Sequence, residues 1–263
     1  AAAGGRAVIP LKDDNPTRRL PVLTLALILA CVGVFLYQSS LPADASLEGQ
    51  VAFTCEFGML PDHVLNGPDP REDLSRTVDA GTVTCQALSQ EHNRFQGLLS
   101  YQFLHADWLH LLGNMLFLWV FGNNIEDRLG RLRFLPFYLL CGVAAALGQA
   151  FVDPSSDVPL IGASGAIAGM LGAYILLFPR AGVWTLVAFV IPLKVPAWLW
   201  IGIYFVLQFL YLGDSATSDG GGVAYMAHIA GFVAGFVLIR PFLAGRDEPP
   251  ARRLESAAGP GRW

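Results

Sequence analysis

The stretch Gly162-Ala163-Ser164-Gly165 opens one long apolar segment of this chain, and Ala227-His-Ile-Ala-Gly-Phe-Val-Ala-Gly235 opens another. Each segment is close to the roughly 17–25 residues that a helix needs to cross a bilayer. A serine and a histidine are costly to keep in hydrocarbon, so polar residues in such segments are candidates for function. Both stretches therefore predict membrane helices that carry reactive side chains.

Composition places the whole chain in the membrane class. Of its 263 residues, 54% are hydrophobic and 14% are charged, and the mean hydropathy is +0.48. Soluble domains carry roughly 25% charged residues. The net charge of −4 and the lack of a basic patch argue against a nucleic-acid partner. The sequence has no Cys/His cluster at metal-ligand spacing and no HExxH motif, so we expect neither a metal nor another cofactor.

Hydropathy divides the chain into six predicted spans and predicts an all-α, polytopic fold. The spans lie at about 20–37, 105–125, 134–152, 160–178, 196–212 and 223–239. Residues 183–193 are apolar but too short to span, and we expect them to insert at the membrane interface.

The first apolar run also has some features of a cleavable signal peptide. Basic residues precede it, and Ala43-Asp44-Ala45 follows it. Signal cores are about 7–15 residues long, whereas this run covers 20–37, so we expect a retained helix. The predicted organisation is a cytoplasmic segment 1–19, a membrane domain 20–240 and a disordered cytoplasmic tail 241–263.

The distribution of positive charge supports this topology. All lysines and arginines except Arg71, Arg76 and Arg94 fall in segments that share one side of the membrane if the N-terminus is cytoplasmic. Basic residues gather on the cytoplasmic side of membrane proteins. The same arrangement places Ser164 and His228 near the outer ends of helices four and six, at similar depth.

The four cysteines fall into two groups. Cys31 and Cys141 lie in apolar spans and are expected to be buried thiols. Cys55 and Cys85 share the long polar connection 38–97, and loops of this length are usually functional or carry short helices of their own. They could pair in an oxidising compartment, but the sequence leaves the pairing open.

Small residues give helices four and six a means of close contact. Gly165 follows Ser164 directly, and Gly231 and Gly235 lie on the helix face of His228. Small residues let membrane helices approach closely, which would bring the serine hydroxyl within hydrogen-bond reach of the imidazole. Gly162 precedes the serine by two residues and is expected to have a structural role near the site. Ordinary helix packing is the alternative interpretation of the glycines.

Two further polar pairs belong to the second span. His110 and Asn114 share one helix face, and two side-chain donors beside a nucleophilic serine suit an oxyanion hole. A polar pair that joins neighbouring helices is the alternative. Glu126 and Arg128, at the inner end of this span, are interpreted as a structural turn.

Together, Gly162-Ala-Ser-Gly165, Ala227-His-Ile-Ala-Gly231 and His110-x-x-x-Asn114 resemble the rhomboid intramembrane serine proteases over about residues 15–240. The resemblance implies a six-helix core, a Ser164 nucleophile and a His228 general base without a carboxylate. It also implies an oxyanion hole formed by His110, Asn114 and the Ser164 N–H, a structural Glu126/Arg128 pair, a membrane-embedded first loop and a gate at Pro196–Leu212.

The chain departs from that family pattern at two places. Many members have a Trp-Arg pair in the first loop, where this chain reads Asn93-Arg94-Phe95-Gln96-Gly97. Some members place a tyrosine beneath the catalytic histidine, where this chain has Ala168. His228 must therefore be oriented by packing or by another group.

The expected function is an intramembrane serine endopeptidase that cleaves transmembrane segments of membrane proteins. Its partners would be those substrates and the lipid bilayer, in a plasma or inner membrane, with the active site toward the outer face. The alternative is a rhomboid-like protein that binds membrane clients without cleaving them.

Overall fold

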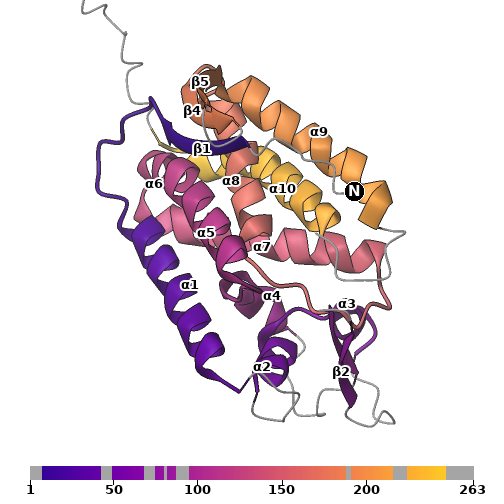
Figure 1. Ribbon diagram of the computed structural model, residues 1–263. Coiled ribbons are helices and arrows are strands. Elements are labelled where there is room, and N and C mark those ends of the chain that lie inside the picture. Colours follow the sequence, from indigo (N-terminus) through magenta and orange to yellow (C-terminus); the bar gives the residue numbers. More distant parts are fainter. Residues whose placement is uncertain are drawn as a thin grey trace, which may run out of the picture.

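The computed structural model describes residues 8–42, 49–67, 75–79, 82–86, 95–187, 191–215 and 224–246 (Figure 1). Most of these residues are helical. The helices are α1 (Val22–Ser40), α2 (Gln50–Phe57), α3 (Pro61–Leu65), α4 (Gly97–Ser100), the 3-10 helix η1 (Tyr101–Phe103), α5 (Trp108–Phe117), the π-helical turn η2 (Leu118–Gly122), α6 (Asn123–Leu129), α7 (Arg131–Val152), α8 (Ser164–Leu177), α9 (Ala197–Ser215) and α10 (Tyr225–Leu243). The strands are β1 (Val8–Asp13), β2 (Ser75–Asp79), β3 (Thr82–Gln86), β4 (Gly182–Val187) and β5 (Ile191–Pro196).

Helical structure occupies every segment that hydropathy predicts to span the membrane. By length and composition, α1, α7 and α10 could each cross a bilayer, whereas α8 and the described part of α9 are apolar but shorter. The second predicted span consists of α5, η2 and α6, which follow one another directly. Helix α10 continues to Leu243, so the first residues of the expected disordered tail are helical.

The expectation of an all-α fold is wrong at one end of the bundle. There β4 and β5 form an antiparallel hairpin from the segment expected to be an interfacial insertion, and β1 pairs with β4 as the third strand. The hairpin sequence is rich in valine and also contains threonine and tryptophan, residue types that favour strands. An ion pair of 2.6 Å between Lys194 and Asp14 joins β5 to the end of β1.

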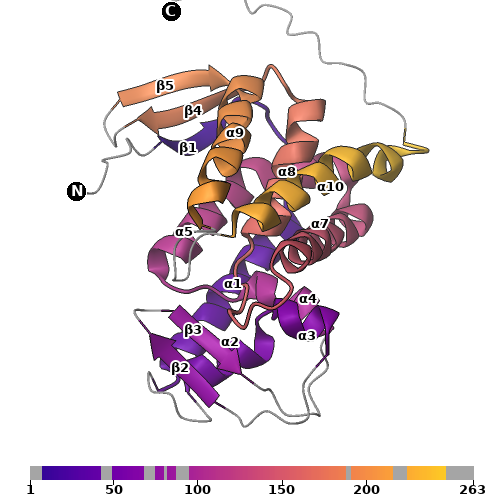
Figure 2. The same cartoon turned by 90° about the vertical axis from the view of Figure 1, so that its right-hand side faces the viewer.

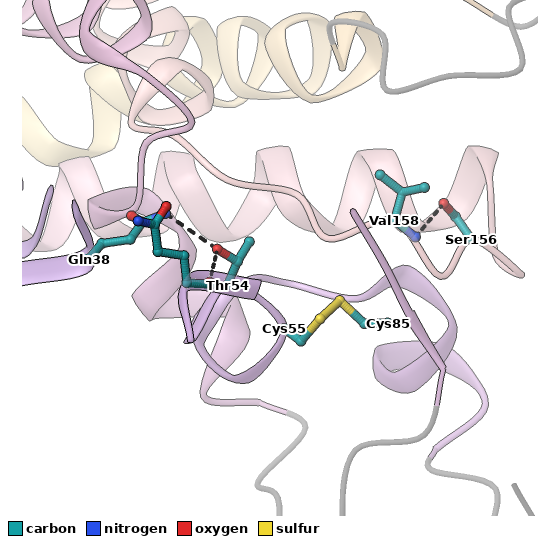
Figure 3. The surroundings of a disulfide bond; sticks show 7 residues. Gln38, Thr54, Cys55, Cys85, Ser156 and Val158 are labelled. Atoms are coloured by element: carbon teal, nitrogen blue, oxygen red, sulfur yellow. Dashed lines mark hydrogen bonds between the residues drawn. A yellow bond between two sulfur atoms is a disulfide. The ribbon is translucent and has the colours of Figure 1, made fainter. Parts of the chain in front are cut away.

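The connection between α1 and α5 forms a small subdomain with its own elements. Helix α2 lies beside the β2–β3 hairpin, and a disulfide between Cys55 and Cys85 links α2 to β3 (Figure 3). The structure thus answers the pairing question that the sequence left open. Cys31 and Cys141 are buried free thiols, as expected. Asn93 and Arg94, where the family has a Trp-Arg pair, lie outside the described residues.

The sheet and the disulfide-bonded subdomain occupy opposite ends of the helical bundle (Figure 2). At the sheet end, the Glu126 carboxylate accepts hydrogen bonds from the Leu23 and Thr24 N–H groups at 3.0 and 2.7 Å. A carboxylate suits a helix N-terminus, where backbone N–H groups lack partners. Glu126 therefore fixes the start of α1 to α6.

Helix α8 lies in the centre of the bundle, with every residue from Gly165 to Tyr174 buried. Its backbone is in contact with that of α10. A Cβ atom at Gly231 would collide with the Gly165 carbonyl oxygen, and one at Gly235 would collide with that of Gly169. Only glycine allows so close an approach, and this approach positions the first turns of α8 and α10 side by side.

Candidate active site

Ser164 is the first residue of α8, directly after a turn that requires glycine. Gly162 has φ +116°, a conformation that residues with a side chain rarely adopt. Its N–H donates to the Tyr101 carbonyl at 2.9 Å, which fastens the turn to η1. A Cβ atom at Gly162 would lie 2.7 Å from Nε2 of His110, so the turn also makes room for that ring.

His228 projects from the first turn of α10 toward the start of α8. Its Nε2 atom lies 2.8 Å from the Ser164 hydroxyl oxygen, which is the distance of a hydrogen bond. His228 is buried and Ser164 is half-buried. The structure thus joins the two residues that the sequence paired.

The other ring nitrogen of His228 is bonded to a residue that the sequence reasoning missed. The side-chain oxygen Oε1 of Gln208, on α9, lies 2.8 Å from His228 Nδ1. The Gln208 amide nitrogen donates to the Tyr204 carbonyl at 3.2 Å, which directs the amide oxygen toward the histidine. Because that oxygen only accepts, Nδ1 carries the proton and Nε2 is left as the acceptor for the serine hydroxyl.

Gln208 makes a side-chain contact with His228 that Ala168 cannot make. Ala168 is fully buried and offers His228 no ring to stack on. A signal for Gln208 was present in the sequence, because an amide in the middle of an apolar segment needs a hydrogen-bond partner. The sequence did not show which residue that partner would be, since α9 and α10 meet only in the folded chain.

His110 lies against the Gly162 turn. The Asp107 carboxylate accepts from the His110 backbone N–H at 2.8 Å and caps α5. The Ala106 N–H donates to His110 Nδ1 at 3.4 Å, so in the neutral ring Nε2 carries the proton. That N–H faces the turn that precedes Ser164.

Asn114 lies one turn after His110 and is buried. Its amide nitrogen donates to the His110 carbonyl at 2.9 Å, within its own helix, rather than to the serine. Glu126 and Arg128 lie on α6, where Glu126 caps α1 and Arg128 is half-buried. Neither is part of the hydrogen-bonded group around Ser164.

The arrangement has the parts that acyl transfer requires. A hydroxyl is bonded to a histidine in the basic tautomer, a neutral amide orients that histidine, and a second imidazole N–H lies beside the turn. Among the described residues, no group of three or more His, Cys, Asp or Glu side chains could hold a metal ion.

Comparison with known proteins identifies the family. The model of the rhomboid domain matches residues 92–245, which is more than half of the chain and includes every residue of this site. The chain belongs to the rhomboid family. Together with the apolar helices, this membership makes it an integral membrane protein.

Relatives come from several kingdoms. This rhomboid chain is 29% identical to Rhomboid protein 1, mitochondrial, of Saccharomyces cerevisiae, over 63% of the chain and 46% of the yeast protein. It is 28% identical to RHOMBOID-like protein 5 of Arabidopsis thaliana, over 82% of the chain and 66% of the relative. It is 34% identical to the Putative rhomboid protease YdcA of Bacillus subtilis, over 36% of the chain and 48% of the relative. The matches thus cover less than two thirds of these relatives.

Proposed function

We propose that this rhomboid is an intramembrane serine endopeptidase that cleaves transmembrane segments of other membrane proteins. The observation that carries the proposal is the 2.8 Å hydrogen bond between Ser164 and His228, with the histidine held in the tautomer that accepts a proton. Two relatives have protease in their names, the protein of Bacillus subtilis and Rhomboid-like protease 5 of Toxoplasma gondii, which supports the same reaction.

The proposed reaction is acyl transfer in two stages. Ser164 attacks the scissile carbonyl while His228 Nε2 takes the hydroxyl proton. His228 then returns that proton to the leaving amine, and the peptide remains on the serine as an ester. Water, deprotonated by the same nitrogen, hydrolyses the ester and restores the free hydroxyl.

Gln208 acts in this scheme as a positioning residue. Its amide oxygen accepts the Nδ1 proton of His228 in the neutral ring and stays bonded to it in the imidazolium that forms during attack. It therefore takes the orienting position that a carboxylate holds in a triad, without adding a charge in the membrane.

The Nε2–H group of His110, beside the Gly162 turn, and the backbone N–H of Ser164 would stabilise the oxyanion. Asn114 can join them if its amide rotates away from the His110 carbonyl, which it now binds.

We further propose the six-span topology for this chain. Helices α1, α7 and α10 would cross the membrane with α8, α9 and the α5–α6 rod. The disulfide-bonded subdomain would lie at the outer face, partly embedded, because disulfides persist in oxidising compartments. The N- and C-terminal segments would be cytoplasmic, in agreement with the distribution of basic residues.

The second candidate is a rhomboid-like protein that binds membrane clients without cleaving them. To distinguish the two, the purified protein is incubated with a fluorophosphonate probe and, separately, with a model transmembrane substrate. We expect labelling and cleavage in the parent and in the Ser155→Ala control, and neither in Ser164→Ala. His228→Ala should lose at least about a hundredfold in rate, because it removes the general base. Binding of the substrate without labelling or cleavage would establish the client-binding function instead.

A further inference from the structure

A cavity of about 460 Å³ lies outside the candidate active site, at the end of the bundle that also carries the sheet. It opens where α1 and α7 begin and where the chain leaves α10. Its lining includes four arginines, Arg19, Arg131, Arg133 and Arg246. It also includes Leu20, just before α1, and Leu132, the second residue of α7.

The cavity carries an excess of positive charge. Glu126 and Asp127 are the acidic residues in its lining, against four arginines. The Glu126 carboxylate is already bonded to the Leu23 and Thr24 N–H groups and to the Thr24 hydroxyl. The remaining charge therefore favours an anion, and arginine is the side chain best suited to bind phosphate oxygens.

Two of the arginines contact other parts of the chain. Arg133 Nη1 donates to the Phe242 and Ala244 carbonyls at 2.8 and 2.9 Å, which ties α7 to the end of α10. The Arg246 guanidinium lies over Gly130, where an added Cβ atom would be 2.6 Å from Nη1. Gly130 has φ +71°, a backbone conformation that favours glycine. Two of the four arginines are thus packed against the rest of the protein.

The two leucines indicate what kind of anion fits. Leu20 is 77% exposed and Leu132 is 93% exposed, and both line the cavity beside the arginines. They lie at the ends of helices that are long and apolar enough to cross a bilayer, the level at which phospholipid phosphates meet their acyl chains. A free phosphate would gain nothing from these leucines, whereas a phospholipid would cover them.

We propose that this cavity binds an anionic phospholipid, with its phosphate among the four arginines and its acyl chains along Leu20 and Leu132. Basic pockets between membrane helices are suited to such headgroups. The proposal depends on the membership of the chain in a membrane-protein family and is independent of the proposed protease activity.

The test measures binding to the full chain in a non-ionic detergent. Thermal unfolding is followed with increasing dioctanoyl phosphatidylglycerol, dioctanoyl phosphatidylcholine or inorganic phosphate, because a ligand that binds the folded state raises its melting temperature. We expect phosphatidylglycerol alone to raise it. Arg131→Gln/Arg246→Gln should weaken the apparent affinity about tenfold or more. Lys12→Gln/Arg180→Gln, which removes equal charge outside the cavity, should leave it unchanged.

A second variant keeps the test valid if the double arginine variant does not fold. Leu132→Gln alters a side chain with little buried surface and should weaken phosphatidylglycerol binding several-fold. The proposal is overturned if phosphatidylcholine stabilises the parent equally, or if inorganic phosphate gives the full effect. It also fails if the two double variants respond alike or if Leu132→Gln binds as the parent does.

Discussion

At the scale of single residues, the hydrogen bonds around His228 fit its proposed role as a general base without a carboxylate partner. The Tyr204 carbonyl fixes the Gln208 amide, the amide fixes the His228 tautomer, and the tautomer leaves Nε2 open to the Ser164 hydroxyl. Each bond in this series orients the next group. The series ends at Ser164, the proposed nucleophile, so a change at its start should alter the chemical step without altering substrate binding.

We expect Gln208→Leu to lower kcat about tenfold to a hundredfold while KM stays the same, because the histidine loses the bond that holds its tautomer. Gln208→Glu keeps an acceptor at the same position and should restore most of the rate. The negative charge would favour the imidazolium, so the acidic limb of its kcat profile should move to higher pH. Steady-state cleavage of a model substrate across pH measures the rates of both variants and the shift of the pH profile. A rise in KM at constant kcat would place Gln208 in substrate binding instead.

A second residue-scale prediction concerns Asp13, at the end of β1. Burial raises the pKa of its carboxyl from 3.8 to about 6, although Tyr174 and Asn124 donate hydrogen bonds to it. The folded state therefore holds this proton more tightly than the unfolded state. Its contribution to stability is fully present below about pH 4 and is lost as pH rises through about 6.

Thermal unfolding of the detergent-solubilised protein between pH 4 and 7 tests this sign. Between pH 4 and 7 the melting temperature of Asp13→Asn should fall less than that of the parent, because the variant lacks the titrating carboxyl. The exposed Asp153→Asn serves as control and should follow the parent. A parent whose pH dependence matches that of Asp13→Asn would contradict the prediction.

At the scale of elements, the contact between α8 and α10 determines where the reactive groups meet. The glycines of the two helices place one backbone against the other, with Gly235 opposite the Gly169 carbonyl. The spacing of these glycines was visible in the sequence, and so were the helices, because long apolar segments leave few alternatives in a membrane.

Gly235→Ala should lower the melting temperature and slow fluorophosphonate labelling, because the new methyl group would push α10 away from α8. Overpacking of this kind costs about 1–3 kcal/mol. Gly33→Ala in α1 is the matched control, since nothing lies within 4 Å of its added Cβ atom. It should be neutral, or more stable by up to about 1 kcal/mol. Equal effects of the two substitutions would show that the glycine contact is not tight.

The strands and the contact of Gln208 with His228 could not be predicted from glycine spacing and hydropathy. Residues 183–193 form a short apolar run, which hydropathy cannot distinguish from an interfacial segment. Their pairing with β1 joins parts of the chain that are far apart in sequence. Gln208 lies in an apolar segment, and the sequence does not show which residue its side chain bonds to. Only the packing of α9 beside α10 brings it to His228.

At the scale of the whole molecule, the two ends of the helical bundle carry different structures. One carries the disulfide-bonded subdomain, and the other carries the sheet and the arginine-lined cavity (Figure 2). Ser155, in the loop between α7 and α8, lies near the first end, because the carbonyls of its neighbours Pro154 and Ser156 accept hydrogen bonds from Asn66 and Asp62. Lys12, in β1, lies at the second.

The proposed topology predicts that these ends face opposite sides of the membrane. A membrane-impermeant maleimide should label Ser155→Cys in right-side-out vesicles and Lys12→Cys only in inside-out vesicles. Both positions are exposed, while the native free thiols Cys31 and Cys141 are buried and should give little background. Labelling of both variants from the same side would refute the topology.

Backbone contact between α8 and α10 also bears on how freely this sequence can change. Where leucines or phenylalanines separate two helices, each substitution at the contact alters the distance between them. No such spacer lies between Gly165 and Gly231 or between Gly169 and Gly235. The separation of Ser164 from His228 is therefore set by main-chain atoms, which every sequence shares. Lipid-facing side chains elsewhere on the bundle can vary to suit membranes of different thickness while this distance is preserved.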